Sequence, residues 1–330
     1  MQPHTGSPRF RILNLEPEGY SAKAKALLDQ CGTVTDGPLS RDALLGSLTD
    51  YDILIVRLAH QIDKEVIEAG PRLKAIVSAT TGLDHIDLQA AEAKRIAVLS
   101  LRGEEEFLRR ISATAELTWG LLLALMRRIP EAVMSVQAGD WSRDSFKGRD
   151  LEGRRLGIVG VGRVGRRIAE FGSAFRMQVA GYDPHATGWP AAVQRKPSLN
   201  ALLAETDVLS IHVNLHSGTV GLIGRQELQL LPRGAVVINT SRGAVVDEDA
   251  LLEALVSGHV YGAATDVVTH ERDEDRRRAN PLIVYSRTHH HALITPHIGG
   301  VTEEAMCKTE VFMAKKLVAF LAPSEVATVS

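Results

Sequence analysis

The chain has 330 residues, of which 45% are hydrophobic and 24% are charged, and its formal net charge at pH 7 is −2. This length suits two domains, and the composition is that of a globular protein. A charge so close to neutral gives no reason to expect nucleic acid or an anionic membrane as a partner. The apolar run at 117–126 is too short to span a bilayer, and residues 1–20 lack the apolar block of a signal peptide, so a cytoplasmic protein is expected.

Short apolar runs typical of buried strands alternate with amphipathic helical patterns, which favours an α/β fold with parallel sheets. A long helix is expected from Ile111 to Gln137. Because residues 115–126 are apolar nearly all round, this helix should be buried against another domain or a second subunit. The other elements expected in the first third are strands at 11–15, 52–56, 74–79 and 96–100, and helices at 20–30 and 85–94.

A more regular series of elements begins at Arg155. Six strands with crossovers, as expected here, form a complete doubly wound nucleotide-binding fold. An amphipathic helix follows at 302–322, with Thr302 as its N-cap. The six strands are expected at 155–160, 178–183, 208–213, 235–240, 262–268 and 292–296.

A G-x-G-x-x-G motif lies between the first two strands of this series. Gly160 would permit a tight turn, Gly162 a close approach of the backbone to a pyrophosphate, and Gly165 close packing of helix on strand. The helix N-terminus would then present free N–H groups to the phosphates. Asp183 stands where a carboxylate meets the adenosine ribose and repels a 2′-phosphate, so NAD is the expected cofactor. Arginines near the start of the helix leave NADP as an alternative.

Three further polar residues, Arg242, Glu271 and His297, each lie in a segment that follows an expected strand. Ligands of doubly wound sheets bind outside the carboxyl ends of the strands, so these side chains should face one crevice. Arginine can bind a carboxylate, and histidine titrates near neutrality. A glutamate beside histidine can hold its ring and favour its charged form.

The segments 151–169, 222–255 and 294–300 resemble the D-isomer-specific 2-hydroxyacid dehydrogenase family, and the likeness covers nearly the whole chain. The resemblance implies a Rossmann NAD-binding domain at 104–296, inserted in a flavodoxin-like substrate domain made of 1–103 and 297–330. It also implies hydride transfer between NAD and a small 2-hydroxy or 2-oxo acid, and a homodimer.

The resemblance further implies a role for each candidate site residue. In the catalytic set, His297 carries the proton, Glu271 holds its ring and Arg242 binds the substrate carboxylate. Asp266 would hydrogen-bond the nicotinamide carboxamide. The full cofactor-binding set is Gly160, Gly162, Arg163, Val164, Gly165, Asp183, Thr240 and Asp266. The substrate-binding set is Thr80, Thr81, Gly82, Arg57 and Arg242, and no metal is expected.

Several alternatives stay open. The segment after Asp266 lacks the prolines and the aromatic residue common in the family, so Asp273 or Glu274 could take the place of Glu271. Arg57 matches an arginine that binds substrate phosphate in phosphoglycerate dehydrogenases, although the lysine that usually follows is missing. A phosphoglycerate-like substrate is therefore expected, with a glyoxylate or hydroxypyruvate reductase as one alternative. An NAD(H)-sensing corepressor-type binding protein is the alternative of another class. The three histidines at 289–291 are expected to be surface residues without a metal.

Overall fold

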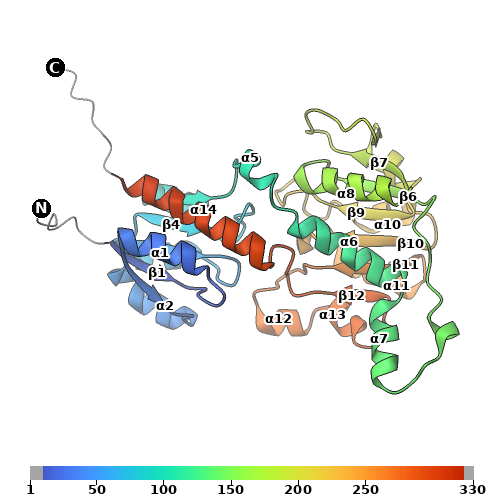
Figure 1. Cartoon of the computed structure of the whole chain (residues 1–330), viewed down its shortest axis with the longest axis horizontal. Coiled ribbons are helices and arrows are strands. Elements are labelled where there is room, and N and C mark those ends of the chain that lie inside the picture. The colour runs from blue at the N-terminus through green and yellow to red at the C-terminus, as the bar shows by residue number, and fades with distance from the viewer. Residues whose placement is uncertain (1–9, 323–330) are drawn as a thin grey trace, which may run out of the picture. The chain divides into compact units, whose positions relative to one another are not determined.

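The computed structural model describes residues 10–322, which divide into two compact units (Figure 1). Unit 1 consists of Met1–Leu108 together with Thr302–Ser330, and unit 2 is Arg109–Val301. The two crossings therefore lie after residues 108 and 301, whereas the sequence predicted them after 103 and 296. His297 consequently belongs to unit 2, together with Arg242 and Glu271.

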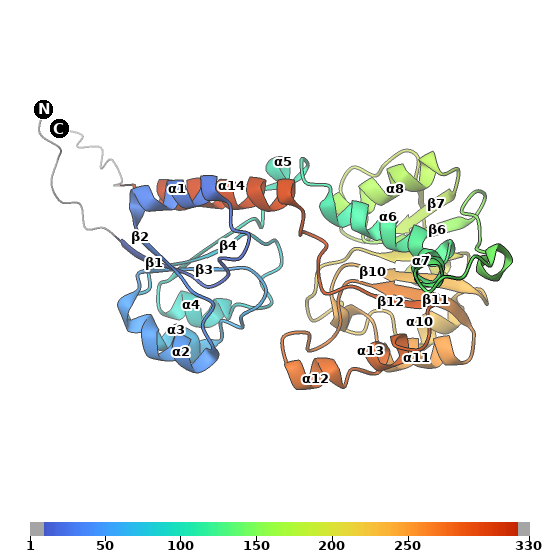
Figure 2. The same cartoon turned by 60° about the horizontal axis from the view of Figure 1, so that its bottom comes forward.

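Unit 1 is built on a five-stranded parallel sheet with the order β2-β1-β3-β4-β5. This is the flavodoxin-like order, as predicted. Figure 2 shows α1 (Ala22–Cys31) and α14 (Glu303–Leu321) on one face of the sheet. The other face is covered by α2 (Arg41–Ser47), α3 (Lys64–Ala69) and α4 (Leu88–Ala93), while η1 (Leu48–Asp50) and α5 (Glu105–Leu108) lie in connections. The strands are β1 (Phe10–Asn14), β2 (Gly32–Asp36), β3 (Ile53–Val56), β4 (Ala75–Ser78) and β5 (Ala97–Ser100).

Unit 2 contains a seven-stranded parallel sheet with the order β12-β11-β10-β9-β6-β7-β8. This doubly wound order reverses between β6 and β9, and such a reversal opens a crevice at the carboxyl ends of the strands. One strand more than predicted is present, because β8 has only two residues and leaves no apolar pattern in the sequence. The strands are β6 (Arg155–Val159), β7 (Gln178–Tyr182), β8 (Gln194–Arg195), β9 (Val208–Ile211), β10 (Ala235–Asn239), β11 (Val260–Thr265) and β12 (Ala292–Ile294).

Helices cover both faces of this sheet (Figure 2). The apolar side chains of α6 and α8 pack against one face, and those of α10, α11 and α13 against the other. None of the described helices is long and apolar enough to cross a membrane. The helices of unit 2 are α6 (Ala113–Met126), α7 (Ile129–Gln137), η2 (Arg143–Phe146), α8 (Arg163–Ala174), α9 (Leu199–Leu203), α10 (Arg225–Leu230), η3 (Gly243–Val245), α11 (Glu248–Val256), α12 (Glu274–Arg278) and α13 (Pro281–Ser286).

The prediction of one helix at 111–137 was wrong, because α6 and α7 are separate helices. Arg128 between them has left-handed backbone, with φ of +53°. Pro130 then occupies the first turn of α7, where its missing N–H costs nothing, and it cannot continue a helix from before the break. The Arg128 guanidinium holds the break through two hydrogen bonds of 2.7 and 2.9 Å to the Glu131 carboxylate.

The apolar segment is buried as predicted, but its cover comes from its own unit and not from another domain, and the predicted contact with a second subunit stays a prediction. Helix α6 is buried inside unit 2, where Leu122 and Leu125 are each 2% exposed. Trp119 meets Phe171 and Phe175 edge-on, with ring centroids 5.8 and 5.0 Å away. An all-round apolar helix needs cover on several sides, and the sheet and α8 of its own unit supply it. The exposed apolar face lies on α7 instead.

Candidate active site

The glycine motif forms the turn between β6 and α8. Gly160 has φ of +90°, and a Cβ there would lie 2.7 Å from the carbonyl oxygen of His212. A Cβ on Gly165 would lie 2.1 Å from the carbonyl oxygen of Gly160, so helix and turn pack backbone to backbone. A Cβ on Gly162, in contrast, would meet nothing within 4 Å. The turn is thus packed on its inner side and open at the N-terminus of α8, where an anion can bind.

Asp183, which follows β7, fixes this turn from the next strand. Its carboxylate accepts hydrogen bonds from the backbone N–H of Val161 at 2.9 Å and of His185 at 2.8 Å. Each oxygen retains a lone pair, so the carboxylate can still receive ribose hydroxyls. Arg163 donates to the Ile111 carbonyl at 2.9 Å, and burial lowers the pKa of its guanidinium. Its predicted contact with a cofactor stays a prediction.

Glu271 and His297 meet in unit 2. The Nδ1 atom of His297 and Oε1 of Glu271 are 2.7 Å apart, and both side chains are about one-fifth exposed. With Nδ1 facing the carboxylate, Nε2 is the ring atom that can exchange a proton with a ligand. The two alternative acids are engaged elsewhere, because Asp273 caps α12 through the Arg276 N–H at 3.0 Å and Glu274 pairs with Arg278.

The loop that carries His297 is held by Asp266, which is 1% exposed. One carboxylate oxygen of Asp266 accepts the Thr295 hydroxyl at 2.6 Å and the Ile298 N–H at 2.8 Å, and the other accepts the Gly299 N–H at 2.7 Å. Burial raises the pKa of Asp266, while these hydrogen bonds act in the opposite direction. They also hold His297 in left-handed backbone, with φ of +55°. The predicted contact of Asp266 with nicotinamide remains a prediction.

Arg242 lies in the loop after β10. Asn239 holds this loop, since its side-chain oxygen accepts the N–H and hydroxyl of Ser241 and its amide donates to the Arg242 carbonyl at 3.0 Å. The hydroxyls of Thr240 and Thr118 are 2.7 Å apart, which joins the same loop to α6. Arg242, Glu271 and His297 thus all follow parallel strands of one sheet, β10, β11 and β12, which are neighbours.

Comparison with known proteins identifies the family of the chain. Residues 119–299 match the family described as D-isomer specific 2-hydroxyacid dehydrogenase, NAD binding domain. The chain belongs to this family. It is 36% identical over 309 residues to the hydroxypyruvate reductase of Thermotoga maritima, a match that covers 94% of this chain and 97% of that protein.

Two further relatives carry other names. The chain is 36% identical over 295 residues to the D-3-phosphoglycerate dehydrogenase of Methanocaldococcus jannaschii, covering 88% of this chain but only 54% of that protein. It therefore spans about half the length of that relative. The D-lactate dehydrogenase of Aquifex aeolicus, solved with NAD and lactic acid, superposes with a TM-score of 0.82 at 27% identity and covers 94% of this chain and 95% of its own.

Sequence reasoning missed a second histidine at the carboxyl edge of the same sheet. His212 follows β9, and its Nε2 lies 2.7 Å from the Ser210 hydroxyl. Burial lowers the pKa of His212 to about 3, so its ring is neutral near pH 7 and cannot donate a proton as an imidazolium. The sequence did place His212 near the carboxyl end of the predicted strand 208–213, and that location was the available signal. Between the two histidines, only His297 has a carboxylate hydrogen-bonded to its ring in the described part of the chain.

The predicted substrate-binding residues Thr80–Gly82 and Arg57 lie in unit 1. Thr80 follows β4 and stiffens its own loop, because its hydroxyl donates to the Gly82 carbonyl at 2.8 Å. The Arg57 guanidinium lies 3.5 Å from carboxylate oxygens of Glu16 and Glu310 and donates to the carbonyls of Glu16 and Glu18. These contacts tie β3 to the loop after β1 and to α14. The predicted contacts with substrate stay predictions.

The three adjacent histidines do not gather around one point. His289 stacks on Tyr285 with ring centroids 3.8 Å apart, His290 is exposed, and His291 bonds the Tyr285 hydroxyl at 2.9 Å. Within residues 10–322, no group of three or more histidine, cysteine or acidic side chains is placed to hold a metal ion.

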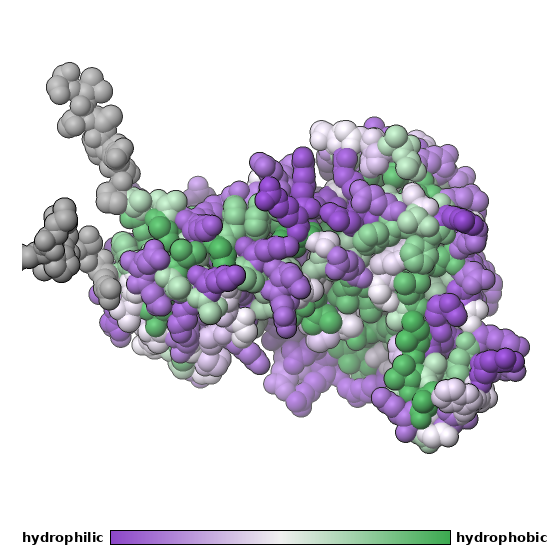
Figure 3. Space-filling model, in the orientation of Figure 1, coloured by the Kyte–Doolittle hydropathy of each residue, from purple (hydrophilic) through white to green (hydrophobic). Residues whose placement is uncertain are grey.

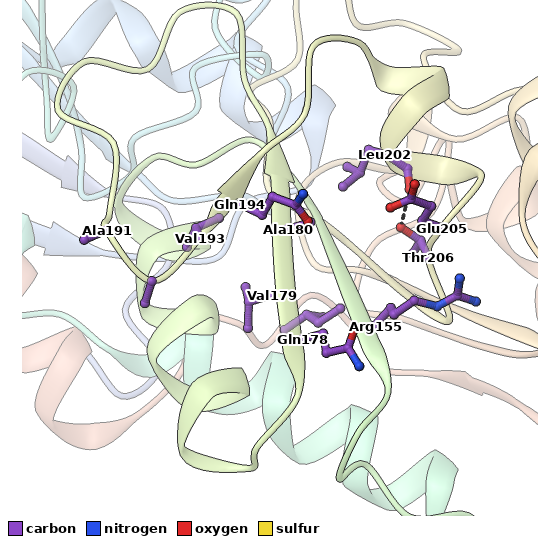
Figure 4. A pocket seen from close by; sticks show the side chains of 12 residues that line it. Arg155, Gln178, Val179, Ala180, Ala191, Val193, Gln194, Leu202, Glu205 and Thr206 are labelled. Carbon is purple, nitrogen blue, oxygen red and sulfur yellow. Dashed lines mark hydrogen bonds between the residues drawn. The ribbon is translucent and has the colours of Figure 1, made fainter.

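A cavity of about 400 Å³ lies on β6 and β7 but away from the glycine turn (Figure 4). Its lining includes Arg155 and Gln178, the first residues of these strands, whereas the turn follows their last residues. Its charged side chains are already paired, Arg155 with Asp207 at 2.6 Å and Glu205 with Lys196. The cavity is therefore separate from the candidate active site.

The glycine turn makes a prediction that separates folding from ligand binding. Gly165→Ala places a methyl group against the Gly160 backbone and should lower the midpoint of thermal unfolding. Gly162→Ala meets no protein atom, so we expect an unchanged midpoint and at least tenfold weaker binding of NADH, measured by fluorescence titration. Unchanged NADH binding in Gly162→Ala would contradict a pyrophosphate site at this turn.

Proposed function

We propose that this protein is an NAD-dependent D-2-hydroxyacid dehydrogenase, which reversibly interconverts a small 2-oxo acid and its 2-hydroxy acid. The observation that carries the proposal is the hydrogen bond of 2.7 Å between Glu271 and His297, in the same unit as Arg242 and the glycine turn. Membership of the dehydrogenase family supports it. Such a reaction requires a general acid–base group and a binding site for the dinucleotide.

NAD fits the residues present. The open position at Gly162 and the N-terminus of α8 suit the pyrophosphate, and the Asp183 carboxylate suits the ribose hydroxyls. The same carboxylate disfavours a 2′-phosphate, which makes NADP the weaker alternative. When bound, NAD supplies the hydride acceptor and NADH the hydride donor of the reaction.

The protein residues handle the carboxylate and the proton. In the reductive direction, protonated His297 donates from Nε2 to the carbonyl oxygen of the substrate, and Glu271 stabilises the charged ring and fixes its orientation through Nδ1. In the oxidative direction, the neutral ring accepts the hydroxyl proton. One guanidinium nitrogen of Arg242 donates to the Ser241 carbonyl at 2.8 Å. We assign the same side chain to the substrate carboxylate, where a planar guanidinium would orient the reacting carbon.

The contacts of Arg57 bear on the choice of substrate. An arginine that binds substrate phosphate needs free donors, but this side chain is 22% exposed and already faces two carboxylates and two carbonyls. These contacts favour an unphosphorylated acid, such as hydroxypyruvate or glyoxylate, over a phosphoglycerate-like acid. One relative that this chain matches over nearly its full length is a hydroxypyruvate reductase.

The decisive test is the decay of NADH absorbance with a panel of phosphorylated and unphosphorylated 2-oxo acids. We expect turnover of at least one acid, with unphosphorylated acids preferred. His297→Asn should lower kcat by roughly 10²–10⁴ with NADH affinity unchanged, because asparagine tolerates left-handed backbone but its amide cannot act as a general acid or base near neutral pH. His290→Ala, on the exposed surface, is the control and should be fully active. Failure of the native protein to reduce any acid while it binds NADH would favour the binding-protein alternative.

Glu271→Gln should change the pH profile as well as the rate. The amide keeps a hydrogen-bonding oxygen but removes the negative charge 2.7 Å from the ring, so the protonated imidazole loses its stabilisation. Reduction requires that protonated form, so kcat/KM for reduction should begin to fall at a lower pH than in the native protein. A profile that coincides with the native one would show that the glutamate does not act on this proton.

We propose further that a second copy of this chain covers α7. No residue of α7 is buried, and Ile129, Val133, Met134 and Val136 are each 46–51% exposed. Figure 3 shows apolar side chains gathered over this helix. Trp141, just beyond α7, is 84% exposed. Exposed apolar groups concentrated in one short segment are typical of an interface between subunits.

Val133→Asp should then reduce the mass measured by light scattering at micromolar concentration from that of two chains to that of one. Burial of an unpaired carboxylate at the interface costs free energy, and this cost should exceed the free energy gained when two chains associate. Val256→Asp, which places the same charge at a valine 68% exposed on α11, is the control and should leave the mass unchanged. A native protein that is monomeric would exclude this proposal.

A further inference from the structure

Glu248, the first residue of α11, uses its carboxylate to hold residues outside its own helix. One carboxylate oxygen accepts the Thr269 N–H at 2.6 Å, and the other accepts the Thr269 hydroxyl and the Asn280 side-chain amide, both at 2.6 Å. The helix does not need it as a cap, since Asp247 accepts the Ala250 N–H at 3.0 Å. An acid in a first turn usually acts on the helix dipole alone, whereas this one holds another loop.

The loop that Glu248 holds is the one that carries Glu271. Thr269 is two residues before Glu271, and His270 between them has left-handed backbone, with φ of +53°. A bulky residue keeps this conformation only when its surroundings enforce it. Glu248 fixes the chain before the turn, and Arg277 fixes it after the turn by donating to the Glu271 carbonyl at 2.7 Å.

The same loop also contacts the segment that carries Arg242. A Cβ on Gly243 would lie 2.2 Å from the carbonyl carbon of Val268 and 2.4 Å from the nitrogen of Thr269. The two backbones are therefore in direct contact, and a displacement of Thr269 would disturb both segments. Asn280 is 4% exposed and caps α13 with its side-chain oxygen, so the third partner of Glu248 is itself fixed.

Resting on the proposed function, we propose that Glu248 is a positioning residue that sets the Glu271 carboxylate against His297. It touches neither reacting atoms nor His297, and it acts through Thr269 and the turn at His270. Three hydrogen-bond donors point at the two oxygens of the Glu248 carboxylate, so this position requires an acceptor on both sides. A glutamine here would present its NH₂ group to at least one of the three donors.

The test is a double-mutant cycle of Glu248→Gln and Glu271→Gln. Glu248→Gln alone should lower kcat/KM for reduction on the order of tenfold and shift its pH profile toward that of Glu271→Gln, with NADH affinity within about twofold of native. In the Glu271→Gln background, the same change should cost less than about twofold, because the group that it positions is already gone. An equal loss in both backgrounds, or a native pH profile in Glu248→Gln, would overturn the proposal.

Two matched variants control for charge and folding. Asp249→Asn removes an exposed charge from the same first turn of α11 and should leave the pH profile native. Thr269→Ser keeps both donors to Glu248 and should also behave as native, while Thr269→Val loses the hydroxyl bond and should shift the profile in the same direction as Glu248→Gln. Thr269→Val therefore serves as the test if Glu248→Gln unfolds, and a native profile in that variant would overturn the proposal.

A measurement without substrate separates this proposal from the proposed function. The His297 ring can be titrated by NMR in the free protein, where its protonation reports the nearby Glu271 carboxylate. The midpoint should move to lower pH in both Glu248→Gln and Glu271→Gln. If no 2-oxo acid is reduced but this shift occurs, the proposed function fails and the positioning role stands. If turnover is native-like and the midpoint does not move in Glu248→Gln, the positioning role fails alone.

Discussion

The buried Asp266 carboxylate is the interaction on which the arrangement of the candidate active site depends. It follows β11 and receives three hydrogen bonds from the loop after β12, so one side chain joins the ends of two neighbouring strands. A carboxylate at 1% exposure is costly unless it is fully hydrogen-bonded, and here the cost is offset by donors that belong to the loop it organises. The left-handed backbone of His297, and hence the direction of its ring toward Glu271, follows from these bonds.

Around this carboxylate, the loops after β10, β11 and β12 restrain one another. Asn239 shapes the segment of Arg242, close contact at Gly243 joins that segment to Thr269, and Glu248 anchors Thr269 from α11. Each link is a backbone contact or a short hydrogen bond within unit 2. Because the links form a chain, the position of the Glu271–His297 pair is tied to residues that contact neither of these two side chains.

Much of this could be predicted from the sequence, since local pattern and strand order determine it. The glycine motif, the acid after β7 and the polar residues after β10, β11 and β12 could be read because parallel strands place their carboxyl ends at one edge. The break at Arg128 was overlooked although Pro130 signals it, because a proline cannot continue a helix that began before it. The bonds of Glu248 were also hidden, because its partners Thr269 and Asn280 are distant in sequence and only the folded chain brings them together.

The left-handed backbone at His297 has an evolutionary consequence. Among residues other than glycine, asparagine and aspartate adopt this conformation most readily, and the genetic code places both a single-nucleotide change away from histidine. Under the proposed function, a lineage can therefore lose the proton carrier while it keeps the loop, the fold and the glycine turn. The route from enzyme to folded, cofactor-binding pseudoenzyme is short at this position, whereas replacement by a β-branched residue would first have to rebuild the loop.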